Sequence, residues 1–134
     1  MTAQKYTVLL YSDDQLVRER MRSAIGSAPA TDVAVTFIEA SNSGEVWRIL
    51  DGTELDLLIL DGEAVPAGGL GIARQVKDDY PESPPVLLVI ARAADRWLAS
   101  YAKVEATALH PLDPMKTAAT VADLLRGEST ISQA

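Results

Sequence analysis

The sequence contains no cysteine, only one histidine and no cluster of lysine and arginine residues. Without cysteine the chain has neither disulfides nor thiolate metal sites. Its formal net charge is −7, and an acidic chain with no basic patch lacks the electrostatic footprint that nucleic-acid backbones require. We therefore expect no binding of DNA or RNA.

Long apolar runs are missing as well. The apolar runs are far shorter than the roughly 20 residues that cross a bilayer, and residues 1–5 are too polar for a signal peptide. We expect a protein of the cytoplasm that makes no contact with a membrane. A length of 134 residues with 48% hydrophobic residues suits one compact domain. We expect this domain to cover residues 1–127 and residues 128–134 to form a flexible tail.

Five short apolar runs have the length and composition of buried strands. They are residues 6–11, 33–38, 57–60, 86–90 and 106–109. Helical spacing predicts a first helix capped by Asp13 or Asp14 and closed between Gly26 and Pro29, a second from Ser43 to near Gly52, a third over 69–79, a fourth over 94–104, and a fifth from Pro114 to just before Gly127. Strands that are apolar throughout and alternate with helices predict an α/β fold, a parallel sheet covered on both faces.

Acidic side chains follow two of the expected strands. Asp13 and Asp14 come directly after the first strand, and Asp61 ends the third. Ligand sites of open parallel sheets lie at the carboxyl ends of the strands. If the two strands are neighbours, three carboxylates converge at one edge of the sheet. Taken alone, an Asp-Asp pair before a helix is most often only a helix cap, and the combination with Asp61 is what favours a site.

Converging carboxylates repel one another unless protons or a cation offset their charge. Oxygen ligands suit Mg2+, which takes one or two carboxylates, a backbone carbonyl and waters. The carbonyl of Glu63, two residues past Asp61, is the natural further ligand. An aspartate beside Mg2+ can accept a phosphoryl group and form an aspartyl phosphate.

Four segments together resemble the receiver domains of two-component response regulators. They are VLLYSDDQLVRE (8–19), IEASNSGE (38–45), LDLLILD (55–61) and GLGIA (69–73). The resemblance extends over residues 6–126 and implies a flavodoxin-like (βα)5 sandwich with sheet order 2-1-3-4-5. It also implies that Asp61 is the phosphoacceptor, that Asp14 binds Mg2+ directly and that Asp13 binds it through water.

The switch half of the family's pattern is degenerate in this chain. Ile90 stands where the family has Thr or Ser, His110 where it has Lys, and Thr107 where it often has Tyr or Phe. Pro66 arrives one residue later than usual. Loss of one hydrogen bond to a charged phosphoryl group removes about 1.5–3 kcal/mol, so phosphorylation should switch this chain weakly. A lone His before Pro is more typical of an ordinary strand end than of a phosphate contact, and the resemblance implies a cis His110–Pro111 peptide.

The expected fourth helix places Trp97, Tyr101 and Val104 on one stripe. A stripe of this kind is more typical of core packing, which is our first interpretation. The alternative is a docking or dimer patch, because this helix belongs to the partner face of the family. In that case the resemblance implies a homodimer through the fourth helix, the fifth strand and the fifth helix.

Our preferred hypothesis is an atypical stand-alone receiver that accepts a phosphoryl group at Asp61 from a histidine kinase or phosphotransfer protein. We expect no output domain after Arg126, so the chain should signal through a protein partner in trans. The alternative is a pseudo-receiver, a binding or dimerisation module that works without phosphorylation. We do not expect an enzyme: a phosphatase of the haloacid dehalogenase class needs Asp-x-Asp where residues 13–15 read Asp-Asp-Gln, and a dinucleotide site needs a glycine-rich turn there.

Overall fold

The computed structural model describes residues 3–127 of the chain, so the expected tail at 128–134 lies outside the described residues. The strands are β1 (Gln4–Tyr11), β2 (Val33–Ala40), β3 (Leu57–Asp61), β4 (Val86–Ile90) and β5 (Ala106–Leu109). The helices are α1 (Gln15–Ile25), α2 (Ser43–Gly52), α3 (Gly69–Asp79), the 3-10 helix η1 (Ala93–Trp97), α4 (Leu98–Ala102) and α5 (Pro114–Leu125). Strands and helices alternate along the chain, as the apolar pattern predicts.

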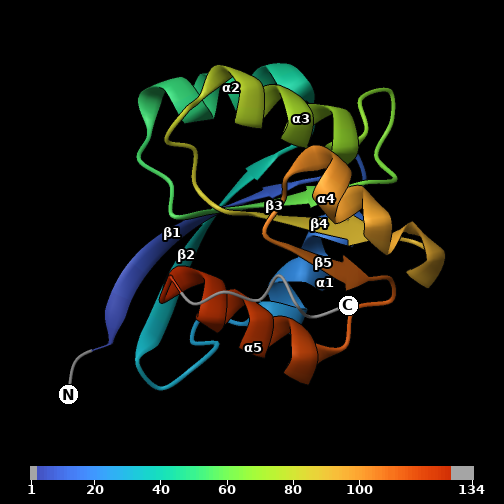
Figure 1. Ribbon diagram of the computed structural model, residues 1–134. Coiled ribbons are helices and arrows are strands. Elements are labelled where there is room, and N and C mark those ends of the chain that lie inside the picture. The colour runs from blue at the N-terminus through green and yellow to red at the C-terminus, as the bar shows by residue number, and fades with distance from the viewer. Residues whose placement is uncertain (1–2, 128–134) are drawn as a thin grey trace.

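The five strands form one parallel sheet in the order β2-β1-β3-β4-β5. This confirms the predicted fold class and strand order. Helices α1 and α5 cover one face of the sheet, and α2, α3 and α4 cover the other (Figure 1). The chain leaves β1 in one direction for β2 and returns to its other side at β3. The carboxyl ends of β1 and β3 therefore lie side by side at the point where the strand order reverses.

Both faces of the sheet are buried, which is why the strands are apolar throughout. In β3, Leu57 and Ile59 pack towards α1 and α5, while Leu58 and Leu60 pack towards α2, α3 and α4. Full burial of one such side chain contributes about 1.5–3 kcal/mol. Among residues 3–127, no helix is both long and apolar enough to span a bilayer.

Polar side chains cap the N-termini of the first two helices. Asp14 caps α1 through a hydrogen bond from the Leu16 amide to its Oδ1, and α1 ends at Gly26, whose φ of 73° is left-handed. Asn42 caps α2 by accepting from the Glu45 amide. The His110–Pro111 peptide is cis, as the resemblance implies.

The fourth helix differs from the prediction. Residues 94–104 do not form one helix but a 3-10 turn, η1, followed by the single short helix α4, which ends at the left-handed Lys103. Ala102 and Val104 are buried, whereas Trp97 is 63% and Tyr101 51% exposed. The core interpretation of the two aromatics is thus wrong. Leu98, Ala99 and Ala102 are the α4 residues that pack against the core, whereas the two aromatics are exposed.

Candidate functional site

A cavity of about 520 Å3 opens at the carboxyl ends of β1, β3 and β5. Its lining includes Asp13, Asp14, Arg20, Asp61, Glu63 and His110. The structure therefore brings the acidic residues that the sequence singled out together with His110, and it adds Arg20 as a neighbouring cationic group. The cavity forms because three loops that follow strands of the same sheet meet at one edge.

Asp61 ends β3 as a nearly buried carboxylate, 3% exposed. Its Oδ2 accepts a hydrogen bond from Ser12 Oγ at 2.8 Å. Its Oδ1 accepts from the Glu63 amide at 2.9 Å and lies 3.4 Å from His110 Nε2. Burial on its own raises the pKa of Asp61, but the hydrogen bonds from His110, the Glu63 amide and Ser12 outweigh it and hold the pKa below the usual value. Asp61 is therefore ionised near neutral pH although it is buried.

Asp13 and Asp14 both line the cavity, and one carboxylate oxygen of each accepts a backbone hydrogen bond. Asp13 Oδ1 accepts from the Val65 amide at 3.1 Å and so ties the end of β1 to the loop after β3. Asp14 Oδ1 accepts from the Leu16 amide at 2.8 Å, which makes Asp14 the cap of α1. Within the described part of the chain, no three acidic or imidazole side chains gather closely enough to hold a metal ion. Asp14 thus has a helix-capping role in addition to the ligand role that the resemblance implies.

Two of the three degenerate switch positions, Ile90 and Thr107, do not line this cavity. Ile90 ends β4 as a buried side chain in the core beneath α2, α3 and α4, and it contributes only its carbonyl, which accepts from the His110 amide at 2.8 Å. Thr107 is half-buried on β5 and lines a second cavity beside Arg96 and α5. Neither residue lies among those that surround Asp61. Of the three positions, only His110 reaches the candidate site.

Besides Arg20, the sequence analysis missed two further residues next to Asp61 or its loop. Ser12 is fully buried and contacts Asp61, and Tyr11 donates a hydrogen bond from its hydroxyl to the Ala67 carbonyl in the loop after β3. Burial raises the pKa of Tyr11, and the nearby charges of Asp13 and Asp61 raise it further. The available signal was position, because Tyr11 ends the first apolar run and Ser12 stands between this run and the acidic pair.

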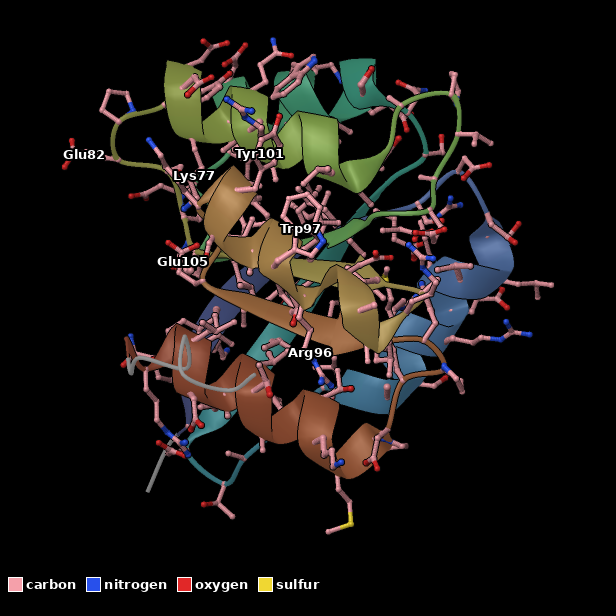
Figure 2. The ribbon with its side chains drawn as sticks, turned by 45° about the vertical axis from the view of Figure 1, so that its right-hand side comes forward. Lys77, Glu82, Arg96, Trp97, Tyr101 and Glu105 are labelled. Carbon is pink, nitrogen blue, oxygen red and sulfur yellow. The ribbon has the colours of Figure 1, made fainter. Side chains whose placement is uncertain are left out.

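The exposed aromatics form a second candidate surface. Trp97 and Tyr101 meet edge to face with ring centroids 6.0 Å apart, and the Arg74 guanidinium lies 4.4 Å from the Tyr101 ring centroid. We call Trp97, Tyr101 and Arg74 the aromatic patch. Figure 2 shows Trp97 of η1 and Tyr101 of α4 beside each other, with Arg96 below them towards α5. Exposed aromatics next to a guanidinium are typical of protein interfaces.

Several known proteins are similar to this chain in sequence or in fold, although no family model matches it. Two response regulatory proteins from strains of Mycobacterium tuberculosis are each 43% identical to it over 120 residues, which cover 89% of this chain and 90% of theirs. A solved structure assigned to a response regulator of Chloroflexus aurantiacus superposes with a TM-score of 0.80 at 18% identity, over 92% of this chain and 99% of that one. A receiver domain protein of Methanospirillum hungatei gives a TM-score of 0.72 at 14% identity, over 92% and 96%.

The two kinds of similarity carry different weight. Likeness to the solved structures establishes the fold, and 43% identity across most of both sequences establishes common descent with the mycobacterial proteins. The parallel order β2-β1-β3-β4-β5, with a buried aspartate at the end of its central strand, fits both. The chain belongs to the response regulators of two-component systems, and its fold is that of their receiver domain.

Proposed function

We propose that this chain accepts a phosphoryl group on Asp61 from a histidine kinase or phosphotransfer protein and signals to a protein partner in trans. The observation that carries the proposal is the state of Asp61: a buried carboxylate kept ionised by donors, at an open acidic cavity. An ionised carboxylate is the nucleophile that phosphoryl transfer needs. A kinase partner of this kind would place the chain in the cytoplasm. We propose that the chain turns over no substrate of its own.

His110 and Arg20 line the cavity together with Asp61 and could contact a phosphoryl group through their nitrogen atoms. His110 Nε2 lies 3.4 Å from Asp61 Oδ1, but an imidazole side chain is shorter than that of lysine. Ile90 has no hydroxyl to follow the phosphoryl group. We therefore expect the aspartyl phosphate to form and to shift the conformation less than in a receiver with the complete pattern.

Asp13, Asp61 and the Glu63 carbonyl are the donors that we propose for Mg2+. The donor chemistry fits, since Mg2+ uses hard oxygen ligands and needs only one or two carboxylates beside its waters. One oxygen of Asp13 and one of Asp14 accept a backbone hydrogen bond, but the partner of Asp13 lies in the loop after Asp61, whereas the partner of Asp14 lies in α1, so Asp14 fits less well. When bound, Mg2+ supplies neutralisation of charge on the phosphoryl oxygens.

The proposal is tested by incubating the protein with Mg2+ and acetyl phosphate and reading the intact mass. We expect one phosphoryl adduct in the wild type and none in Asp61→Asn, because the amide is not a nucleophile. Asp78→Asn is the matched control: it removes an exposed carboxylate from α3, away from the cavity, and should take the adduct as the wild type does. Absence of the adduct from the wild type would instead favour the phosphorylation-independent module, which Ile90 and His110 already suggest.

Asp61 should also make stability depend on pH. Its folded-state pKa is lowered, so its ionised form stabilises the fold above the unfolded pKa of about 3.9 and this contribution is lost as the pH falls through the folded value. We expect the difference in unfolding free energy between wild type and Asp61→Asn to shift against the wild type as the pH drops through that window. Urea titrations at a series of pH values measure it. A difference that is the same at every pH would contradict the assignment of these donors to an ionised Asp61.

The aromatic patch is our proposed partner surface, and a homodimer through α4, β5 and α5 would use the same face. Trp97→Ala should abolish partner binding or self-association while changing stability little, because the ring is 63% exposed. Leu16→Ala, at an α1 residue that is 58% exposed, is the control and should do neither. Sedimentation velocity measures association, and thermal melting measures stability. Unchanged association in Trp97→Ala would exclude the patch as the dimer interface.

A further inference from the structure

Ser12 is a fully buried polar side chain at the candidate site, and its position is fixed from several sides. Its amide donates to the Ala40 carbonyl of β2 at 3.3 Å, and its carbonyl accepts from the Arg18 guanidinium at 2.6 Å. Arg18 is held in turn by Glu39 at 2.8 Å. The Ser12 hydroxyl therefore stands at a defined place at the end of β1, 2.8 Å from Asp61 Oδ2.

The direction of the hydroxyl proton follows from the neighbours. The Asp14 amide donates to Ser12 Oγ at 3.1 Å, so the oxygen already acts as an acceptor there. A hydroxyl has one proton to give, and an ionised carboxylate can only accept. The Ser12 proton is consequently donated to Asp61 Oδ2. Hydrogen bonds of this charge-assisted kind are about twice as strong as those between neutral groups.

The two oxygens of Asp61 differ as a result. Oδ2 is held by the buried Ser12, whereas Oδ1 is held by the Glu63 amide and lies near His110, which lines the cavity. We propose that Ser12 is a positioning residue for phosphoryl acceptance: it fixes Oδ2 on the buried side and presents Oδ1 to the cavity as the attacking oxygen. This inference rests on the proposed function of Asp61.

The step balances without a proton transfer. With an acyl phosphate as donor, a lone pair of Asp61 Oδ1 forms the new bond to phosphorus, and the bond from phosphorus to the acyl oxygen breaks. The carboxylate of the donor leaves with that electron pair, so an anion is both consumed and released. Ser12 keeps its proton throughout, and its hydrogen bond remains on Oδ2, which becomes the carbonyl oxygen of the aspartyl phosphate.

Ser12→Ala tests the inference, with Ser12→Thr to restore the hydroxyl and Ser41→Ala as the matched control. Ser41 follows β2 as Ser12 follows β1, and its hydroxyl also donates to a carboxylate, Glu45 at 2.8 Å, but outside the site. The rate of adduct formation is measured against acetyl phosphate concentration. We expect the maximal rate of Ser12→Ala to fall on the order of 10-fold, with the half-saturating donor concentration unchanged. Ser12→Thr should recover most of the rate, and Ser41→Ala should keep it.

A crystal structure of Ser12→Ala supplies the second readout, and we expect its Asp61 carboxylate to have rotated. If the wild type accepts the phosphoryl group and Ser12→Ala accepts it at the same rate, the inference is overturned and the proposed function stands. A slow rate with Asp61 unmoved would overturn it too. If the wild type takes no phosphoryl group, the proposed function fails and the Asp61 orientation alone decides. Should Ser12→Ala not fold, Ser12→Cys, a weaker donor of similar size, replaces it in both measurements.

Discussion

Gly69→Ala should destabilise the fold by about 3 kcal/mol, near the upper end for overpacking. A Cβ on Gly69, the first residue of α3, would lie 2.7 Å from the Asp61 carbonyl oxygen, 2.8 Å from its carbon and 3.0 Å from the Leu60 carbonyl carbon. All three are backbone atoms of a buried strand, which cannot turn aside as a side chain can. Because Asp61 itself must shift, we also expect acceptance of the phosphoryl group to slow. Urea unfolding measures the stability.

Gly71→Ala, two residues along the same helix, is the matched control. A Cβ there meets no atom within 4 Å, so only the helix preference remains, and alanine should stabilise the fold by about 0.5–1 kcal/mol. The two substitutions add the same methyl group to the same helix and should change stability in opposite directions. If both were tolerated equally, the close approach of α3 to the end of β3 would be wrong.

Asp13→Asn should weaken Mg2+ binding by at least about 10-fold, whereas Asp14→Asn should leave it nearly unchanged. Removing one of two carboxylates takes away a large part of the charge that attracts the ion. Asp13 Oδ1 accepts from the loop after Asp61, whereas Asp14 Oδ1 accepts from α1, and asparagine caps a helix as well as aspartate does. Calorimetric titration gives the affinities, and the rise of melting temperature with Mg2+ provides an independent measure.

The opposite ranking would restore the ligand assignment that the resemblance implies, with Asp14 in direct contact and the helix cap given up on binding. Equal losses in both variants would mean that the whole acidic cluster acts through its charge. A wild type whose melting temperature is the same with Mg2+ and with EDTA, and whose calorimetric titration is flat, would contradict the metal site altogether.

Strands and site residues differed in how well the sequence predicted them. Burial on both faces leaves an unbroken apolar run such as Leu57 to Leu60, and this signal is strong enough to locate a strand and the Asp61 at its end. For the first helix, the sequence does not decide whether Asp13 or Asp14 is the N-cap. Only the backbone geometry decides between them, because neighbouring aspartates have the same chemistry.

The wrong prediction for the two aromatics and the omission of Ser12 have the same cause: both depend on three-dimensional contacts that a sequence pattern does not contain. The stripe of Trp97 and Tyr101 has the spacing of a buried face, but spacing does not say which side of a helix meets the sheet. Leu98, Ala99 and Ala102 face the core instead. Ser12 was overlooked because a serine at a strand end usually belongs to a turn, and its contact with Asp61 joins residues 49 positions apart.

The exposure of Trp97 has a spectroscopic consequence. The chain has two tryptophans; Trp97 is 63% exposed beside Tyr101 and Arg74, while Trp47 on α2 is half-buried. Neither lines the cavity around Asp61. Intrinsic emission should therefore contain a red-shifted component from Trp97 that water and added iodide can quench. A ligand confined to the Asp61 cavity should leave this component largely unchanged, whereas a protein that covers α4 should shift it to the blue and shield it from iodide. One fluorescence titration can thus distinguish occupancy of the cavity from docking on the aromatic patch.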